Sequence, residues 1–324
     1  NGWGSFTSSN SILVRESLSN KVGKRISGKN ILLAVGGRPN RPDISGAELG
    51  WLSDDMFNLK SFPDNIVVVG GGFIACEFAS ILNGLGINVT VLVRGKQLLS
   101  DFDEDLSTEL TEGMRRNGIE VIFNQRIVAI EGSPGELTVC TNDRIRHKCA
   151  GTLFATGRMP FLNNLKLDSA GVKLSEGKVP VDSNQATNIK NIFAVGDVTN
   201  NKNLTPVAIE EGRAFSDRIF GKKLRYPNYE NIACAVFSNP EIATVGLTER
   251  QAIEKYGANE TKIYMTKFKS MLMAFSGIEN ICLLKLVVIK RSEKIVGCHM
   301  LGEQSAEIIQ MASIALQMGA TKPD

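Results

Sequence analysis

The sequence has no apolar run of the roughly 20 residues that a membrane-spanning helix requires. Its apolar stretch at residues 281–289 is interrupted by Lys285 and is typical of a buried strand. Neither sign of charge is in large excess, because 37 Lys and Arg residues against 34 Asp and Glu residues leave a net charge of only +3. These absences predict a protein that binds neither a membrane nor a nucleic acid.

The six cysteines lack the spacing of a metal-binding or redox-active pair. No two of them form C-x-x-C or C-x-x-x-x-C, so we predict neither a metal site nor a vicinal redox pair among them. We expect free thiols, as in a cytoplasmic protein, and leave an organelle open as an alternative. The cysteines are Cys76, Cys140, Cys149, Cys234, Cys282 and Cys298.

The pattern of apolar residues predicts an α/β protein of two or three domains, since 324 residues exceed what one hydrophobic core usually supports. We expect one sheet to extend through residues 120–155, and a separate α+β domain to begin near residue 231. The expected strands are 5–15, 30–35, 65–69, 88–93, 120–123, 126–131, 137–140, 149–155, 188–198, 232–237, 261–268, 281–289 and 294–300. The expected helices are 73–85, 106–117, 205–220, 248–256 and 305–318.

A glycine-rich turn gives the clearest functional signal. Strand, turn, helix and second strand follow one another within residues 65–93, as in a βαβ unit. The turn fits G-x-G-x-x-A, in which Gly70 permits the tight turn, Gly72 lets the backbone approach a pyrophosphate and Ala75 lets the helix pack closely on the strand. Because a helix N-terminus favours anions, we predict a dinucleotide-binding site here.

The end of the second strand suggests which dinucleotide binds. A NAD site usually has Asp or Glu at this position, where it accepts hydrogen bonds from the ribose. This sequence has Arg94, followed by Lys96, and two cations suit a 2′-phosphate. We therefore predict NADPH over NADH, with surface charges beside a NAD site as the alternative.

Glu77 lies in the first turns of the predicted helix and has two possible roles. An acidic side chain near a helix N-terminus stabilises the helix through its dipole. The same carboxylate could instead face the nicotinamide. The sequence leaves both roles open.

Three further motifs identify a family. Residues 28–39 (GKNILLAVGGRP) and 150–160 (AGTLFATGRMP) repeat one pattern of strand, glycine, arginine and proline, and the two copies flank the dinucleotide unit. Residues 187–197 (TNIKNIFAVGD) end in A-V-G-D. Together with the glycine turn, these motifs resemble the class I pyridine nucleotide-disulfide oxidoreductases. The resemblance implies Rossmann-like FAD- and NAD(P)-binding domains followed by an α+β dimerisation domain, with Asp197 hydrogen-bonded to the ribityl chain of FAD.

The resemblance runs along the whole chain and implies its organisation. It assigns residues 1–40 to the end of a first FAD-binding segment, 41–160 to an NADPH-binding domain, 161–230 to a second FAD-binding segment and 231–324 to an incomplete dimerisation domain of a homodimer. It also leads us to expect an internal portion of a longer protein. The implied cofactor-binding residues are Gly70, Gly72, Ile74, Ala75, Glu77, Arg94, Lys96, Gly157, Gly196, Asp197, Leu204 and Thr205.

The motifs are most similar to those of the branch of the family that reduces glutathione disulfide. In that branch an arginine matching Arg213 binds a carboxylate of the substrate. Two positions depart from the pattern. Phe73 stands where a tyrosine often covers the flavin, and Ser100 stands where a second phosphate-binding arginine is common, so the NADPH preference would rest on Arg94 and Lys96.

The catalytic groups of the family have no counterpart here. The redox cysteine pair and the His-Glu acid/base are expected outside these residues, and His147 and His299 do not match that histidine. The resemblance therefore implies a flavin-dependent, NADPH-linked reductase of glutathione disulfide, with this polypeptide alone inactive. The alternatives are a dihydrolipoamide dehydrogenase, mercuric reductase or trypanothione-type reductase, or a non-catalytic dinucleotide-binding dimer. Arg94 argues against the first of these and Arg213 against the trypanothione type.

Overall fold

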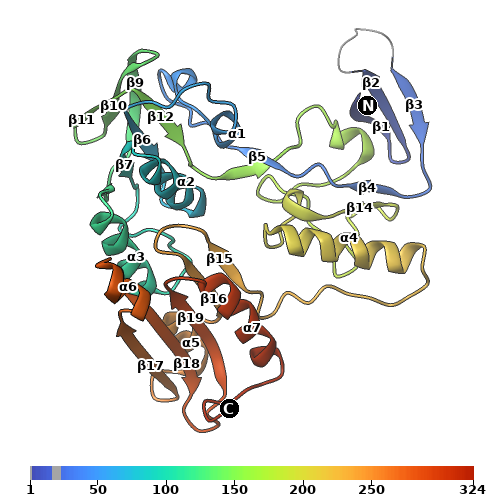
Figure 1. Cartoon of the computed structure of the whole chain (residues 1–324). Coiled ribbons are helices and arrows are strands. Elements are labelled where there is room, and N and C mark those ends of the chain that lie inside the picture. Colours follow the sequence, from blue (N-terminus) through green and yellow to red (C-terminus); the bar gives the residue numbers. More distant parts are fainter. Residues whose placement is uncertain (1, 17–22) are drawn as a thin grey trace. The chain divides into compact units, whose positions relative to one another are not determined.

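The computed structural model describes residues 2–16 and 23–324, which form two compact units (Figure 1). The first unit consists of Asn1–Arg38 and Arg158–Tyr229, and the second of Pro39–Gly157 and Glu230–Asp324. Residues 1 and 17–22, within the expected first FAD-binding segment, lie outside the described part of the chain. Each unit is built from two stretches of sequence that are far apart.

The first unit contains a three-stranded antiparallel sheet, a short parallel strand pair and a long helix. The sheet has the order β1-β2-β3, and β4 pairs in parallel with β14, where Ile31, Leu33, Ile192 and Ala194 are buried. The helix α4 begins with Pro206 in its first turn, as its sequence predicts. The bounds are β1 Gly2–Ser8, β2 Ser11–Glu16, β3 Lys24–Ser27, β4 Ile31–Leu33, η2 Leu167–Ala170, β14 Ile192–Ala194, η3 Gly196–Val198 and α4 Thr205–Ile219.

The two repeated motifs pair with each other. Strand β5 (Gly37–Pro39) forms a two-stranded ribbon with β13 (Arg158–Pro160). Arg158 Nη2 donates to Gly37 O over 2.8 Å, and the Arg38 guanidinium lies over the Phe161 ring. The chain leaves the first unit after Arg38 and returns at Arg158, so the ribbon marks both crossings.

A four-stranded parallel sheet in the order β12-β6-β7-β8 is the centre of the Pro39–Gly157 part of the second unit. The turn, helix and strands agree with the predicted βαβ unit, and all residues of β6 except the first are buried. The bounds are η1 Ala47–Leu49, α1 Ser53–Met56, β6 Asn65–Val69, α2 Phe73–Gly84, β7 Asn88–Leu92, α3 Glu104–Arg116, β8 Glu120–Ile122 and β12 Gly151–Phe154.

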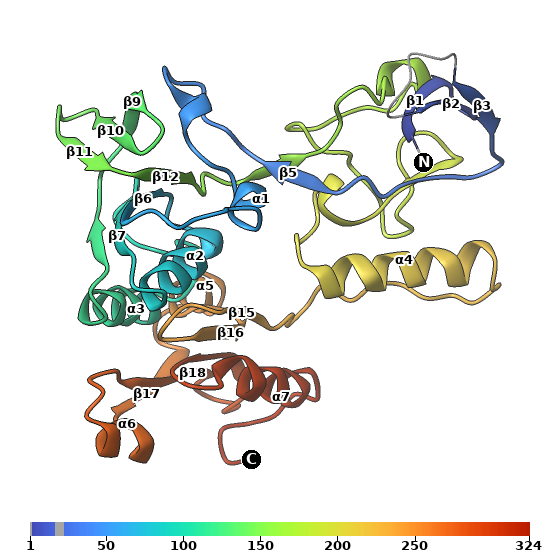
Figure 2. The ribbon, with the colours of Figure 1, turned by 45° about the horizontal axis from the view of Figure 1, so that its top comes forward.

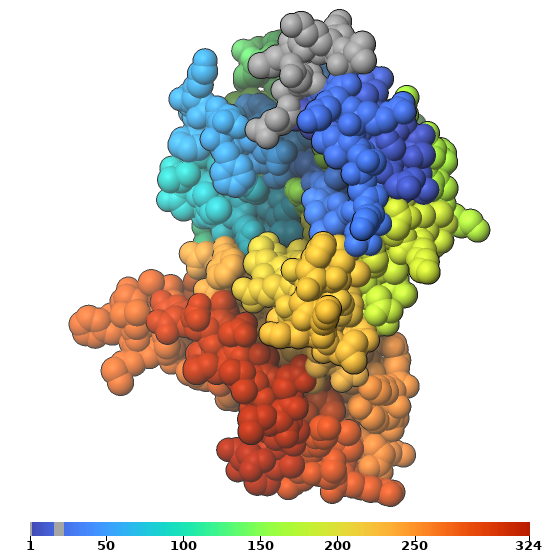
Figure 3. Space-filling model, turned by 90° about the vertical axis from the view of Figure 1, so that its right-hand side faces the viewer, coloured from blue at the N-terminus to red at the C-terminus, as the bar shows by residue number. Residues whose placement is uncertain are grey.

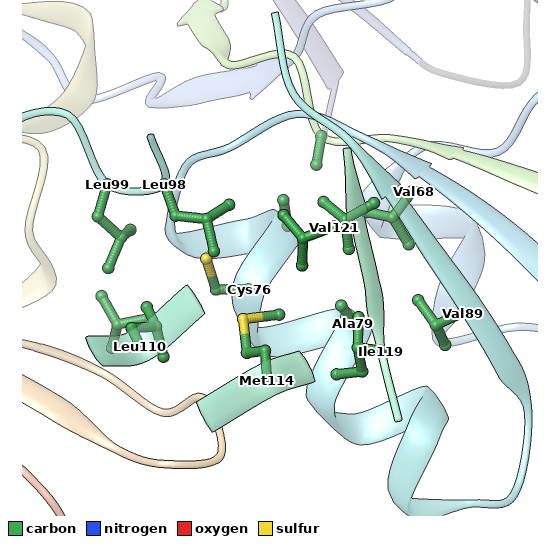
Figure 4. Close-up of a cluster of buried hydrophobic side chains, with 14 of the residues drawn as sticks. Val68, Cys76, Ala79, Val89, Leu98, Leu99, Leu110, Met114, Ile119 and Val121 are labelled. Atoms are coloured by element: carbon green, nitrogen blue, oxygen red, sulfur yellow. The ribbon is translucent and has the colours of Figure 1, made fainter. Parts of the chain in front are cut away.

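Both faces of this sheet are covered, as the continuous apolar runs of its strands require. On one face α2 and α3 pack against Val68, Val89 and Val121, with Cys76 and Met114 filling the space between the helices (Figure 4). The other face is covered by residues of η1 and of a second sheet.

The expectation of one sheet through residues 120–155 was wrong. Strands β9 (Ile127–Ser133), β10 (Glu136–Thr141) and β11 (Arg146–Cys149) form a separate antiparallel sheet, and only β12 returns to the parallel one (Figures 1 and 2). The cause is local. The β9–β10 turn and the β10–β11 turn contain Gly135 and Arg144 with left-handed φ values of +94° and +69°, and such tight turns pair a strand with its own neighbour.

The rest of the second unit is a five-stranded antiparallel sheet with three helices. Its strand order is β15-β16-β19-β18-β17. Sequence analysis missed β16 and α6, because each is only five or six residues long and shows no clear period. The bounds are β15 Cys234–Val236, β16 Ile242–Gly246, α5 Glu249–Tyr256, β17 Thr261–Phe268, α6 Met271–Ser276, β18 Cys282–Ile289, β19 Ile295–Leu301 and α7 Ser305–Gln317.

The two parts of the second unit share one hydrophobic core. Leu283 and Leu301 of the five-stranded sheet belong to the same buried cluster as Leu106 and Leu110 of α3.

Within the described residues, no helix combines the length and the apolar character needed to cross a membrane.

Candidate functional site

The glycine turn between β6 and α2 has room for a ligand on one side only. Gly70 has a φ of +144°, and a Cβ there would lie 2.3 Å from Ala155 O, so any other residue is excluded. A Cβ on Gly71 would lie 2.7 Å from Val93 Cγ1. At Gly72, by contrast, a Cβ would meet no described atom within 4 Å, so this glycine faces open space.

The N-terminus of α2 fits an anion. Gly72 is the N-cap, no side chain caps the helix, and the first turn contains no acidic residue. The first N–H groups and the positive end of the helix dipole are therefore available to a phosphate beside Gly72. Ala75 is fully buried, and Ile74 is partly buried against the core, while Phe73 is 49% exposed. These positions agree with close packing of α2 on β6.

The two predicted phosphate-binding cations follow β7. Arg94 and Lys96 are both exposed, and neither has an ion pair or hydrogen bond within residues 2–16 and 23–324. The loop that carries them is attached to the glycine turn, because Leu99 N donates to Gly71 O over 2.7 Å. Ser100 is exposed on the same loop. The structure thus attaches the loop that carries the two cations to the glycine turn.

Glu77 has a partner that the sequence did not suggest. Its Oε1 accepts a hydrogen bond from Phe237 N over 3.0 Å, and one turn later Ser80 Oγ accepts one from Asn239 N. Both donors lie between β15 and β16. The carboxylate therefore joins α2 to the five-stranded sheet, a role distinct from the two that the sequence left open.

The first unit holds the residues expected to face a flavin. Gly196 has a φ of +74° and begins η3, and Asp197 follows it beside β5, because a Cβ on Gly37 would lie 3.4 Å from Asp197 Oδ2. The turn packs on α4, since a Cβ on Gly196 would lie 3.3 Å from Ala208 Cβ. The Asp197 carboxylate has no hydrogen-bonding partner among the residues described here, so its oxygens are available to a ligand.

The start of α4 has the same character as that of α2. Leu204 is the N-cap, no side chain caps the helix, and no acidic residue lies in its first turn. Thr205 is exposed at the first position. This helix end is a second place where N–H groups and a positive dipole are available to an acceptor.

Sequence analysis missed a buried carboxylate that contacts the turn at Gly196 and Asp197. Glu211 is fully buried, and its Oε2 accepts from Gly196 N over 2.6 Å. Its Oε1 accepts from Asn201 Nδ2 and from Tyr229 OH, each over 2.7 Å. Burial and the hydrogen bond to Glu211 raise the pKa of Tyr229 above its ordinary value. The sequence contained one signal for this burial, because Glu211 lies at helical spacing from the apolar residues Val207, Ala214 and Phe215, which are also buried.

Two further predicted residues are exposed. Arg213 lies on α4 and has no ion pair in the described part of the chain. Gly157 precedes β13 with a φ of +103°, and its carbonyl oxygen accepts from Asn40 N over 2.9 Å. Gly157 belongs to the second unit, whereas Gly196, Asp197, Thr205 and Arg213 belong to the first.

His299 is structural, as its mismatch with the family histidine suggested. It is fully buried on β19, with Leu247 O 3.0 Å from Nε2 and the Thr244 hydroxyl at Nδ1. Because a carbonyl can only accept, Nε2 carries the proton and Nδ1 accepts from Thr244. Burial lowers the pKa of His299, and it is therefore neutral.

Comparison with known sequences decides the family. The pyridine nucleotide-disulphide oxidoreductase profile matches residues 3–212, which is more than half of the chain. The chain belongs to this family. The family's dimerisation-domain profile matches residues 232–324, which include the five-stranded sheet and α7.

Three curated relatives of this disulphide oxidoreductase are similar over nearly its whole length. The glutathione reductases of Nostoc sp. (strain PCC 7120) and Burkholderia cepacia are 43% and 42% identical to it, each over 94% of the chain. The chloroplastic/mitochondrial glutathione reductase of Pisum sativum is 41% identical over 93%. The chain spans 69%, 67% and 55% of these three proteins, respectively.

Solved structures share the fold. The HOCl-induced flavoprotein disulfide reductase RclA of Escherichia coli superimposes with a TM-score of 0.89 at 26% identity, over 99% of this chain and 73% of that one. The Cu(II) complex of the same reductase also gives a TM-score of 0.89 at 26% identity, over 99% and 72% of the two chains.

Proposed function

We propose that this chain belongs to a glutathione reductase, an NADPH- and FAD-dependent enzyme that reduces glutathione disulfide to glutathione. One observation carries the proposal: three curated relatives that share 41–43% identity with this chain, over 93–94% of it, are glutathione reductases. The resemblance of motifs noted above points to the same activity. The whole enzyme is proposed to act as a homodimer in the cytoplasm or an organelle.

The nucleotide site fits NADPH. The open side of Gly72 and the uncapped N-terminus of α2 suit the pyrophosphate. Arg94 and Lys96, which have no partner among the described residues, offer two cations to a 2′-phosphate. Ile74 and Glu77 are proposed to border the nicotinamide, with the Glu77 carboxylate oriented by Phe237 N. When bound, NADPH supplies a hydride to the flavin.

The first unit fits part of a FAD site. The Asp197 oxygens, which have no partner in the described part of the chain, can accept from the hydroxyls of a ribityl chain, and Glu211 fixes the turn by accepting from Gly196 N. Leu204 and Thr205 present the positive end of α4. Gly157 is proposed to contribute to cofactor binding, because a residue without a side chain lets the backbone approach the cofactor closely. Arg213, exposed and unpaired in the described structure, is proposed to bind a substrate carboxylate.

The domain roles follow from the same proposal. Residues 1–40 and 161–230 are proposed to bind FAD, 41–160 to bind NADPH, and 231–324 to form the dimer interface. The redox cysteine pair and the His-Glu acid/base are proposed to come from parts of the enzyme other than these residues, because no paired cysteines occur among those that the structure describes.

Activity of the full-length enzyme tests the proposal. We expect oxidation of NADPH with glutathione disulfide as acceptor, and much slower oxidation with lipoamide, trypanothione disulfide or Hg²⁺. Loss of NADPH absorbance measures each rate. Turnover with one of the other acceptors but not with glutathione disulfide would reassign the enzyme within its family.

Substitution of Arg94 tests the nucleotide preference. In Arg94→Ala we expect the Kd of NADPH to rise by about tenfold or more, because a charge-assisted contact to phosphate is lost, with little change for NADH. Lys148→Ala removes an exposed cation on β11 and serves as the control. Equal weakening of both nucleotides by Arg94→Ala would show that this arginine does not bind a 2′-phosphate.

A further inference from the structure

The loop that carries Arg94 and Lys96 is held in an unfavourable conformation. We call residues 93–103 the cation loop. Leu99, within it, is 4% exposed and has a φ of +46°, in the left-handed region that a branched L-residue rarely adopts. Such a conformation persists only where the surrounding structure imposes it. The attachments of the cation loop therefore decide where its two cations lie.

One attachment is to the glycine turn. Leu99 N donates to Gly71 O over 2.7 Å, and Leu99 O accepts from Ser107 Oγ over 3.3 Å. Leu98 is completely buried and lies beside Cys76 of α2 in the core, as Figure 4 shows. These contacts fix the middle of the cation loop but not its C-terminal end.

The C-terminal end is fixed by a buried ion pair with the dimerisation domain. Asp103 Oδ1 lies 2.8 Å from Lys285 Nζ of β18, and each of these side chains is 1% exposed. Asp103 also caps α3 by accepting from Asp105 N, and its Oδ2 accepts from Glu249 N over 3.0 Å. One carboxylate thus ends the cation loop, begins α3 and joins α5.

Lys285 is charged despite its burial. Burial alone would lower its pKa, but hydrogen bonds to Asp103, Asp105 and Glu249 raise the pKa above its ordinary value. Burial likewise opposes ionisation of Asp103, but the hydrogen bonds from Lys285 and Glu249 N together with the charge of Lys285 outweigh it and lower the pKa of Asp103. Removing Lys285 would leave the buried Asp103 carboxylate without its ion pair, which the structure can relieve only by moving that group towards water. Removing Asp103 would leave Lys285 with Asp105 and Glu249 but would release the cation loop from it.

We infer that Lys285, through Asp103, positions the cation loop and thereby sets the preference for a 2′-phosphorylated nucleotide. Lys285 is a positioning residue, because it acts through Asp103 and lies outside the glycine turn. The inference rests on the proposed NADPH site. It makes the dimerisation domain a determinant of nucleotide specificity in the neighbouring part of the same unit.

Nucleotide affinities of this 324-residue chain test the inference. In Lys285→Met we expect the Kd of NADPH, measured by calorimetric titration, to rise roughly tenfold, equivalent to about 1.4 kcal/mol. The Kd of NADH should change less than about twofold, because the glycine turn keeps its own contacts. A merely structural role would weaken both nucleotides together, so the ratio of the two constants is the decisive readout.

A second variant and a matched control accompany it. Asp103→Asn breaks the same link from the other side while retaining a good helix cap, and it should shift the ratio in the same direction. The double variant should shift it no further than either single one. Lys267→Met removes another lysine that bridges the same two domains, to Glu109 of α3, without touching the cation loop, and should leave the ratio unchanged.

Amide hydrogen exchange gives a readout that needs no nucleotide. We expect faster exchange at residues 95–102 in Lys285→Met and in Asp103→Asn, but not in Lys267→Met. An unchanged Kd ratio in folded variants, or equal losses for both nucleotides, would overturn the inference. If the wild-type chain binds neither nucleotide, the result counts against the proposed function. In that case, unchanged amide hydrogen exchange at residues 95–102 in the variants would still overturn the positioning role of Lys285.

Discussion

Gly70 and Gly72, the two motif glycines of the turn, are glycine for different reasons. Gly70 is required by the fold, because its φ is +144° and a side chain would collide with Ala155 O. Gly72 has an ordinary φ of −87° and open space around the missing Cβ, so the fold itself does not require glycine there. Glycine at position 72 is therefore accounted for by the proposed pyrophosphate site and not by the fold.

Alanine substitutions separate the two requirements. We expect Gly70→Ala to lower the free energy of unfolding by at least about 1 kcal/mol, through backbone strain and the clash with Ala155. Gly72→Ala should change it by less than about 0.5 kcal/mol, yet weaken NADPH binding at least about tenfold, since its Cβ fills the phosphate approach. Urea unfolding and nucleotide titration measure the two effects. Normal NADPH binding by Gly72→Ala would show that the pyrophosphate lies elsewhere.

His299 makes stability depend on pH. Its pKa in the folded protein is lowered by burial, whereas the unfolded chain has the ordinary value of about 6.5. Below that value the unfolded state binds more protons, so stability is lost as the pH falls from about 6.5 towards the folded pKa. We expect His299→Gln to lose less stability than the wild type between about pH 7 and about pH 5.5. Urea midpoints at the two pH values measure this, and identical pH dependence would contradict it.

At the scale of elements, Glu211 stabilises the turn that carries Asp197. Its carboxylate satisfies Gly196 N, and no cation lies among its described partners. We expect Glu211→Leu to destabilise the protein by roughly 1–3 kcal/mol, because buried donors are left unsatisfied. It should also weaken FAD binding by displacing Asp197.

The neighbouring Glu210 provides the control for that variant. It occupies the same helix and pairs with Arg225 at the surface. Its removal in Glu210→Leu should cost no more than about 1 kcal/mol, as is usual for exposed pairs. Chemical unfolding compares the two, and equal losses would show that burial of Glu211 contributes nothing to the turn.

Local order was predictable from the sequence, whereas long-range pairing was not. The β6–α2–β7 unit is found within one residue of its expected bounds, because periodicity and glycine punctuation are local signals. The expectation that β9 and β10 share a sheet with β8 and β12 was wrong, because strand pairing depends on turn geometry. Lys285 read only as an interruption of a strand, since its partners Asp103 and Glu249 are 182 and 36 residues away in sequence.

At the scale of the molecule, one face of the dimerisation domain remains uncovered. The helix α7 faces the viewer in Figure 3, in red, and its exposed apolar residues are Ile308, Met311, Ile314 and the adjoining Met318. Met311 and Ile314 are 65% and 60% exposed. An apolar stripe of this kind on a domain of the dimerisation family is expected to be buried against a second copy.

Charge introduced on this stripe should prevent dimerisation. We expect the double substitution Met311→Glu and Ile314→Glu to convert the full-length enzyme to a monomer, because burying unpaired carboxylates is costly. Met271→Glu alters an even more exposed apolar residue on α6 and should leave the dimer intact. Light scattering coupled to gel filtration measures both. A dimer that persists in the double variant would place the interface elsewhere.

The ribbon of β5 and β13 has a consequence for synthesis on the ribosome. Asn40 N and Gly157 O, at the two ends of the nucleotide-binding insertion, are within hydrogen-bonding distance at 2.9 Å. The strand β4, by contrast, must wait for β14, about 160 residues later, before it can pair. The parallel sheet can form while translation continues. The first unit, whose two segments flank the insertion in sequence, cannot pair β4 with β14 until residue 194 has emerged. The order of translation therefore allows the parallel sheet of the second unit to pair before β4 can pair with β14 in the first unit.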